Sequence, residues 1–148
     1  MSLLNELKKF KKKYPLTVAW RLKSNLKIVE SHLNYDEKVM YIFAGQKNDK
    51  FYDIFSTGVI AITNKRIIIG RKRVIFGYAL DSVMPYMYND MNIRAGLIWG
   101  KVIIDTVKEE VVFSNIDKAA LSEIEKNITN VMIKLKKEYP FEKSDDDE

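Results

Sequence analysis

Apolar residues recur at helical spacing over the first 33 positions of the chain. The first stripe steps by three or four residues and comprises Leu3, Leu7, Phe10 and Tyr14. Pro15 interrupts it, because its ring and missing N–H disfavour a continuous helix. The second stripe comprises Val18, Leu22, Leu26, Val29 and Leu33. Its helix begins either with Pro15 in the first turn or with Thr17 as N-cap. The pattern predicts a helical hairpin.

From Glu37 onward, short apolar runs replace the helical stripes. They predict strands over residues 39–43, 52–63, 66–70, 74–80, 83–94, 97–105 and 111–113. Polar breaks separate them, among them the tight turn at Asn64-Lys65, the basic turn at residues 71–73 and the pair Asp81-Ser82. Strands spaced about ten residues apart favour a small antiparallel barrel or sandwich. Alternating α and β units are absent, which disfavours a parallel sheet.

The clearest single element follows Asp117, a suitable N-cap. A sustained apolar stripe then comprises Ala120 or Leu121, Ile124, Ile128, Val131 or Met132, and Leu135. This helix should close the domain. Beyond Pro140 the chain becomes strongly acidic, so we expect residues 139–148 to form a disordered tail.

The inventory of reactive side chains argues against an enzyme. The 148 residues suffice for one domain and include no cysteine and one histidine. Thiolate chemistry, cysteine zinc sites and sites with two imidazoles are therefore excluded. His32, late in the second helix and outside its stripe, is expected at the surface or helix end. We predict no catalytic residue, no metal and no cofactor.

Two glycines near the sixth predicted strand superficially resemble known motifs. Gly96 and Gly100 precede Lys101, but their spacing is too short for a phosphate-binding loop and Val102 replaces the Ser or Thr that holds magnesium. The GxxxG pattern of membrane helices has no meaning without an apolar segment of about 20 residues. We expect glycines that mark a bend in a small barrel.

The net charge of +5 is unevenly distributed. Residues 1–35 carry +6, residues 36–116 carry +2 and residues 117–148 carry −3. The strongest basic cluster comprises Lys8, Lys9, Lys11, Lys12 and Lys13. With the first apolar stripe it forms a basic amphipathic helix, which can lie on anionic membrane lipid. The alternative is a solvated face of a helix whose stripe packs on the domain or on another subunit.

A second basic cluster comprises Arg71, Lys72 and Arg73. Charges at strand edges discourage unwanted pairing, and this is the plainer explanation for them. Binding of nucleic acid is disfavoured, because it requires basic groups interleaved with exposed aromatic rings. We expect Trp20 and Trp99 to fill the core or an interface instead. Without a signal peptide or an apolar run of about 20 residues, the expected location is the cytoplasm.

An ordered set of short motifs resembles the bacterial pleckstrin-homology (PH) family. It begins at residues 33–39, and its most specific piece is Thr63-Asn64-Lys65-Arg66 between two hydrophobic strands. Residues 78–83, 96–104 and 111–116, followed by a helix, complete it. The resemblance covers about residues 33–135. It implies a seven-stranded, partly open antiparallel barrel capped by a C-terminal helix.

We therefore expect a mainly β fold with helices, divided into a helical extension (1–33), a PH-like domain (34–138) and the acidic tail (139–148). The expected function is a non-enzymatic binding module that acts through protein contacts or homo-oligomerisation. The alternative is peripheral binding to anionic lipid at the inner face of the membrane, through the basic N-terminal helix. Lipid-binding PH domains place several basic residues on the first hairpin, where this chain offers Lys47 and Lys50 beside Asp49.

Overall fold

A computed structural model describes residues 2–47, 56–73 and 76–138. Its α-helices are α1 (Leu3–Lys13), α2 (Leu22–His32) and α3 (Leu121–Glu138), and two short 3-10 turns are η1 (Pro85–Met87) and η2 (Lys118–Ala120). The strands are β1 (Val39–Gln46), β2 (Thr57–Thr63), β3 (Ile67–Lys72), β4 (Tyr78–Val83), β5 (Tyr88–Ala95), β6 (Trp99–Thr106) and β7 (Glu110–Asp117).

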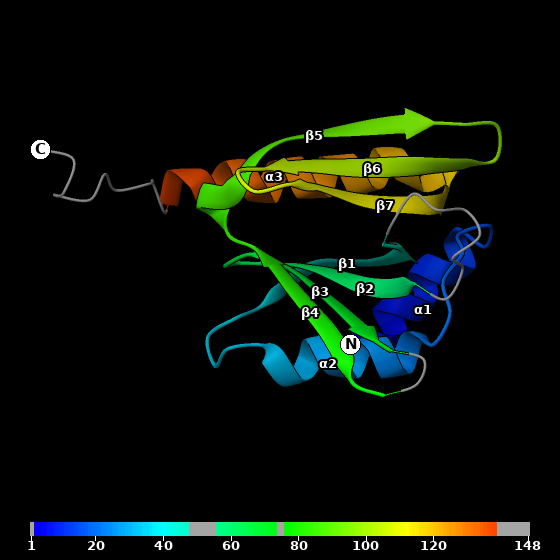
Figure 1. Ribbon diagram of the computed structural model, residues 1–148, viewed down its shortest axis with the longest axis horizontal. Helices are drawn as coiled ribbons and strands as arrows, with labels where there is room; N and C mark the ends of the chain where they lie inside the picture. The colour runs from blue at the N-terminus through cyan, green and yellow to red at the C-terminus, as the bar shows by residue number, and fades with distance from the viewer. Residues whose placement is uncertain (1, 48–55, 74–75, 139–148) are drawn as a thin grey trace, which may run out of the picture.

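The seven strands form one antiparallel sheet in the order β4-β3-β2-β1-β7-β6-β5. The sheet bends into two layers, β1–β4 and β5–β7, which are joined where Gln46 of β1 pairs with Ser114 of β7. Figure 1 shows α3 against the β5–β7 layer and α1 and α2 below the β1–β4 layer. This curled half-barrel with a C-terminal helix and N-terminal helices confirms the expected PH-like fold class.

The apolar face of α3 packs against the inner faces of both layers. Its predicted stripe is buried apart from Val131, which is partly buried, and Ile124, Ile128 and Met132 have no exposed surface. These side chains pack with Phe43 of β1 and Phe113 of β7, whose rings meet edge to face. Asp117 begins the helical segment as predicted, since its carboxylate accepts a hydrogen bond from the N–H of Ala119 at 3.0 Å.

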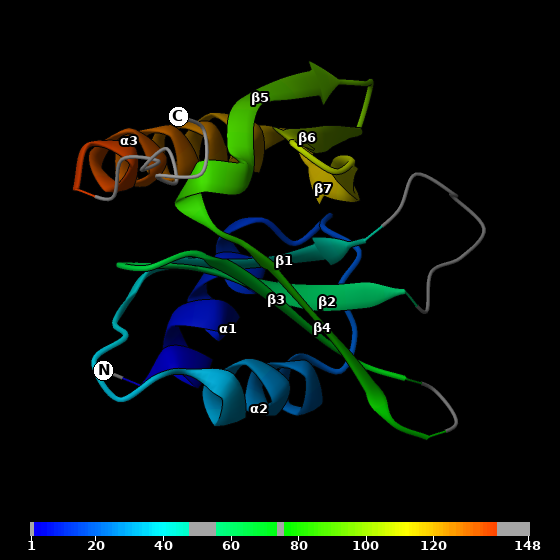
Figure 2. The same ribbon diagram turned by 60° about the vertical axis from the view of Figure 1, so that its left-hand side comes forward.

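A second core lies on the outer face of the β1–β4 layer. The helices α1 and α2 cover this face, and Leu7, Leu26 and Val29 are fully buried against it. Gly70 of β3 permits the close approach of α2, because a Cβ at that position would lie 2.8 Å from Cγ2 of Val29. Figure 2 shows both helices beneath the sheet, on the side opposite α3. The domain boundary at residue 33 stays a prediction.

The second helix begins later than predicted, at Leu22. Residues between the helices make tertiary hydrogen bonds instead of helical ones. The hydroxyl of Thr17 accepts from the N–H of Asp117 at 3.0 Å, and the N–H of Val18 donates to Asn115 at 2.8 Å. The predicted starts at Pro15 or Thr17 are therefore wrong, because these contacts tie the segment to the end of β7.

Several boundaries predicted within the sheet are also wrong. Asp81 and Ser82 lie within β4, where they pair with Ile69 and Ile68 of β3. The strand predicted over residues 83–94 is interrupted by η1, which begins at Pro85. Arg71 and Lys72 belong to β3 and not to a turn. The predicted acidic tail at residues 139–148 lies outside the described residues.

Candidate functional site

The lysines of the α1 cluster differ in their contacts and in their exposure. The ammonium of Lys11 donates to the carbonyl of Pro15 at 2.9 Å and also to that of Thr17. Lys13 forms an ion pair with Glu123 of α3 at 2.8 Å. Lys8, Lys9 and Lys12 are exposed and line a shallow pocket with Asn5. Only part of the predicted basic surface is therefore available to a ligand.

The apolar stripe of α1 packs inside the protein. Leu7 packs in the outer core, and Phe10 and Tyr14 join the inner core, with exposed fractions of 0%, 5% and 6%. An amphipathic helix binds a membrane interface through its apolar face. Because the protein already buries that face, α1 presents only its polar face to the outside.

The other predicted basic residues lie on separate elements. Lys47, at the end of β1, forms an ion pair with Asp81 of β4. In the described part of the chain the buried Nε of Arg71 has no hydrogen-bond partner. The carbonyls of Lys72 and Arg73 accept from the guanidinium of Arg21 at 3.4 and 3.3 Å. Lys50 lies outside the described residues. The structure does not bring these residues together with the lysines of α1, which packs on β1.

The motif Thr63-Asn64-Lys65-Arg66 forms a buried polar clamp. The guanidinium of Arg66 binds Glu37 through two hydrogen bonds, Nε to Oε2 at 3.0 Å and Nη2 to Oε1 at 3.1 Å. It also donates to the carbonyl of His32 at 2.9 Å, the last residue of α2. The hydroxyl of Thr63 donates to Glu37 at 2.6 Å. The motif that carries the family resemblance thus fastens α2 to the β2–β3 turn, which is a structural role.

The clamp determines the ionisation of Glu37. Its side chain is fully buried, and burial alone would raise the pKa of this carboxyl. Hydrogen bonds from Arg66 and Thr63 outweigh burial, so the pKa of Glu37 lies below its usual value. Glu37 is therefore held as a carboxylate and not as an acid available for proton transfer.

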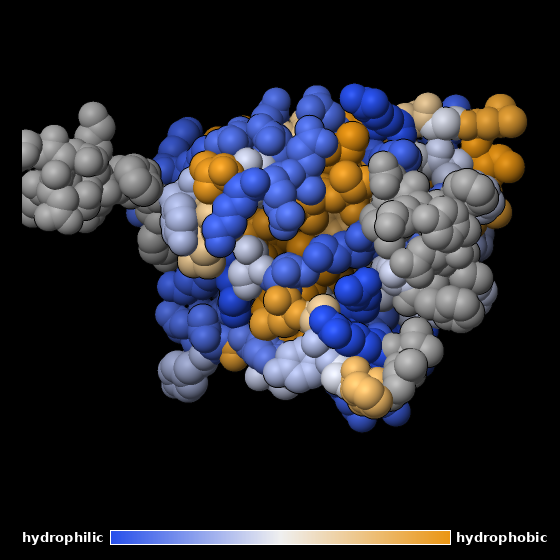
Figure 3. All heavy atoms as spheres, viewed as in Figure 1, coloured by the Kyte–Doolittle hydropathy of each residue, from blue (hydrophilic) through white to orange (hydrophobic). Residues whose placement is uncertain are grey.

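The most conspicuous exposed surface was not predicted. It lies at the turn between β5 and β6 and comprises Leu16, Leu97, Ile98 and Trp99, which we call the hairpin-end surface. Leu97 is 92% exposed, and Ile98 and Trp99 are 46% and 43% exposed. Figure 3 shows hydrophobic atoms gathered at this end of the upper layer. The core alternative for Trp99, and for the 53% exposed Trp20, is therefore wrong.

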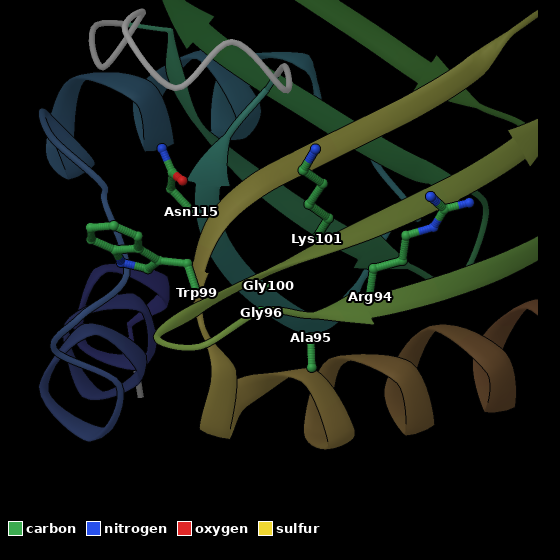
Figure 4. A pocket seen from close by; sticks show the side chains of 7 residues that line it. All are labelled: Arg94, Ala95, Gly96, Trp99, Gly100, Lys101 and Asn115. Atoms are coloured by element: carbon green, nitrogen blue, oxygen red, sulfur yellow. The ribbon is translucent and has the colours of Figure 1, made fainter.

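A pocket of about 290 Å³ adjoins the hairpin-end surface on the outer face of the β5–β7 layer. It is lined by Arg94, Ala95, Gly96, Trp99, Gly100, Lys101 and Asn115. Figure 4 shows the side chains of Arg94 and Lys101 on the same side of the sheet, whereas Ala95 points toward α3. We call this the basic pocket. A sequence signal existed, because apolar Leu97 and Ile98 stand where a hairpin turn would usually be polar.

Other kinds of site find no support in the described residues. They contain no group of three or more histidine, cysteine or acidic side chains suited to a metal ion. His32 lies half-buried at the end of α2, as expected, with Nδ1 2.7 Å from the carbonyl of Ile28. None of the described helices has the length and apolar character that crossing a membrane requires.

The half-barrel, its closing helix and the clamp define a protein of the PH-like class. The sequence profile described as "Bacterial PH domain" matches residues 33–130, and the chain belongs to this family. This confirms the resemblance found in the sequence. Domains of this family are generally binding modules without enzymatic activity.

Two solved structures are similar. One is a DUF1696 family protein with a pleckstrin-homology domain from Shewanella loihica PV-4, with 14% identity and a TM-score of 0.48, covering 76% of this chain and 97% of that one. The other is a pleckstrin-homology domain from Shewanella amazonensis SB2B, with 10% identity and a TM-score of 0.45, covering 78% of this chain and 87% of that one. No curated protein matches the chain.

Proposed function

We propose that this domain is a non-enzymatic binding module that associates with protein, including copies of itself, through the hairpin-end surface and the basic pocket. The observation that carries the proposal is the exposure of Leu97, Ile98 and Trp99 side by side at one end of the molecule. Contiguous exposed apolar side chains with a polar surround are typical of interaction sites. The helices α1 and α2 are poorer candidates for the interaction surface, because their apolar stripes are already buried within the protein.

Sedimentation velocity over a range of concentrations tests this proposal. We expect the wild-type chain to associate with itself as concentration rises, and the double variant Leu97→Asp, Ile98→Asp to remain a monomer. Burial of one large apolar side chain contributes about 1.5–3 kcal/mol, so the association constant should fall by at least about tenfold. The control is Val107→Asp, a 60% exposed apolar residue at the β6–β7 turn. Equal association of all three chains would contradict the proposal.

A second candidate function is peripheral binding to anionic lipid at a membrane surface. It rests on Lys8, Lys9 and Lys12, which lie together on the exposed face of α1 around a pocket of about 270 Å³. Each lysine near an anionic bilayer contributes about 1 kcal/mol, and salt screens that attraction. We expect co-sedimentation with phosphatidylserine vesicles, but not with phosphatidylcholine vesicles, and a loss of binding in high salt.

Two sets of variants test the lipid hypothesis, one with lysines of α1 replaced and one with exposed lysines of α2 replaced. Lys8→Gln, Lys9→Gln and Lys12→Gln together should abolish binding to phosphatidylserine. Lys23→Gln with Lys27→Gln, on the exposed face of α2, should leave it intact. Lys11 and Lys13 are left unchanged because both make structural contacts. Unchanged co-sedimentation of the triple variant would end the lipid hypothesis.

A further inference from the structure

The basic pocket contains two cations, Arg94 and Lys101, that form no ion pair with any acidic side chain of the described residues. Arg94 of β5 lies directly opposite Lys101 of β6 in the antiparallel ladder. Like charges placed opposite each other destabilise a strand pair. Within the described residues, no acidic side chain pairs with either cation, whereas Lys13, Lys47 and Arg66 each have an acidic partner. This arrangement costs stability in the isolated domain and would be relieved by an anionic ligand.

The surroundings of the two cations indicate what kind of anion would fit. Trp99 forms one wall, and its ring is held in place because its indole N–H donates to the carbonyl of Leu16 at 2.6 Å. Leu97 and Ile98 continue the apolar surface beyond it. A ligand that uses the whole site therefore combines carboxylates with apolar or aromatic side chains. An acidic peptide that contains aromatic residues has this chemistry.

The chain itself contains such a segment, outside the described residues. Residues 139–148 include Tyr139 and Phe141, and positions 142–148 hold five acidic residues and one lysine. The charge of this segment is opposite to that of the pocket, and its aromatic residues precede its acidic ones by only a few positions. The charge complementarity identifies the C-terminal segment as the occupant.

Distance favours the segment of a second copy over that of the same copy. α3 begins beside the pocket, since a Cβ on Gly100 would lie 2.3 Å from Cδ1 of Leu121. Its 18 residues then carry the chain about 27 Å away, given a rise of about 1.5 Å per residue. Tyr139 and Phe141 follow Glu138 by one and three residues, so a fully extended chain carries them at most about 11 Å from it. These aromatic residues cannot reach the hairpin-end surface of their own copy, and only a second copy can supply the whole segment.

We propose that the basic pocket binds the acidic C-terminal segment of a second copy of this chain. The inference rests on the proposed function and names its partner. Arg94 and Lys101 bind the carboxylates of residues 145–148, and the hairpin-end surface contacts the aromatic residues that precede them. Because the pocket and the segment are different surfaces, the association is head to tail.

Mixing two variants tests the proposal in full-length chains. The first variant, Arg94→Glu with Lys101→Glu, has a reversed pocket and an intact segment. The second, Asp145→Lys, Asp146→Lys and Asp147→Lys, has a reversed segment and an intact pocket. Each variant alone should associate at least about tenfold more weakly than wild type in sedimentation velocity, since it loses its charge-assisted contacts. The mixture should form heterodimers, because the intact segment of the first fits the intact pocket of the second.

Two controls show whether a loss of association comes from the contact itself or from a change in folding or net charge. The pocket variant replaces one like-charged pair by another, so its thermal unfolding should match that of wild type. Lys8→Glu with Lys12→Glu changes the same number of charges on α1 and should leave association unchanged.

If the pocket and hairpin-end variants abolish association but the segment variant does not, the proposed function survives and this inference is wrong. If wild type is a monomer at every concentration, self-association through this surface is wrong as well. A mixture that stays monomeric also overturns the inference.

Discussion

The two layers of the half-barrel differ in what covers their outer faces. The outer face of β1–β4 lies under α1 and α2, whereas no helix of the described chain covers the outer face of β5–β7 (Figures 1 and 2). The burial of residues along one strand of each layer shows this difference. Every residue of β2 is buried, while β6 alternates, with Val102 and Ile104 buried and Lys101 and Ile103 partly exposed. The same kind of strand is a core element in one layer and a surface element in the other.

This difference separates residues that stabilise the fold from residues available for binding. The basic helix α1 has the sequence of a membrane-binding element, yet its apolar residues are part of two cores. The open layer has fewer charges but leaves Arg94 and Lys101 without acidic partners among the described residues. Net charge along the sequence is therefore a weaker guide to a binding surface than the absence of a covering element.

The largest expected effect comes from breaking the clamp that fastens α2 to the covered layer. Arg66→Met should lower the free energy of unfolding by about 3–5 kcal/mol, because the carboxylate of Glu37 would remain buried without its partner. Urea denaturation measures this loss. Lys13→Met breaks the more exposed ion pair with Glu123 and should change the free energy of unfolding far less than Arg66→Met, which makes it a suitable control. Equal losses in both variants would contradict the structural role of the clamp.

A matched pair of isoleucines compares the two outer faces directly. Ile68 of β3 is fully buried under α2, and Ile103 of β6 is only partly buried on the open face. Ile68→Ala should cost about 2–5 kcal/mol because it leaves a cavity between the sheet and the helices. Ile103→Ala should cost clearly less, within about 1 kcal/mol, because little packing is lost. Thermal or urea unfolding of the two variants checks this, and similar losses would mean that the open face is covered.

A smaller effect concerns pH. The pKa of Glu37 is lower in the folded chain than in the unfolded chain. Its contribution to stability is therefore present above its unfolded pKa of about 4.3 and is lost as the pH falls through the folded value. Glu37→Gln should be less stable at neutral pH and should lose less stability on acidification. Urea midpoints measured across the acidic range test this, and parallel curves for the two proteins would contradict it.

The fold could be predicted from the sequence because its periodicities are strong. The stripes of α3 and α1 are long enough to be unambiguous. Both pack in the two cores, with only Leu3 and Val131 partly buried. The start of α2 could not be predicted, because Thr17 and Val18 bond to residues about a hundred positions away. The spacing of apolar residues within one segment carries no information about hydrogen bonds to such distant residues.

The candidate site was harder to predict for the same reason. Arg94 and Lys101 are seven residues apart and become neighbours only through the register of β5 and β6. Leu16 meets Trp99 only because the segment before α2 crosses the end of β7. The lysine cluster of α1 was visible in the sequence, but the partners of Lys11 and Lys13 in the folded chain were not.

The outer face of the β1–β4 layer is covered by helices, and we propose that the end of the β5–β7 layer binds a partner. Thiol labelling compares the two places in one experiment, since the sequence contains no cysteine. Ile98→Cys should react rapidly in dilute solution and more slowly as the protein is concentrated, whereas Ile68→Cys should react slowly under all native conditions. If Ile68→Cys reacts as fast as Ile98→Cys in the folded protein, or if the reactivity of Ile98→Cys is independent of concentration, the account is contradicted.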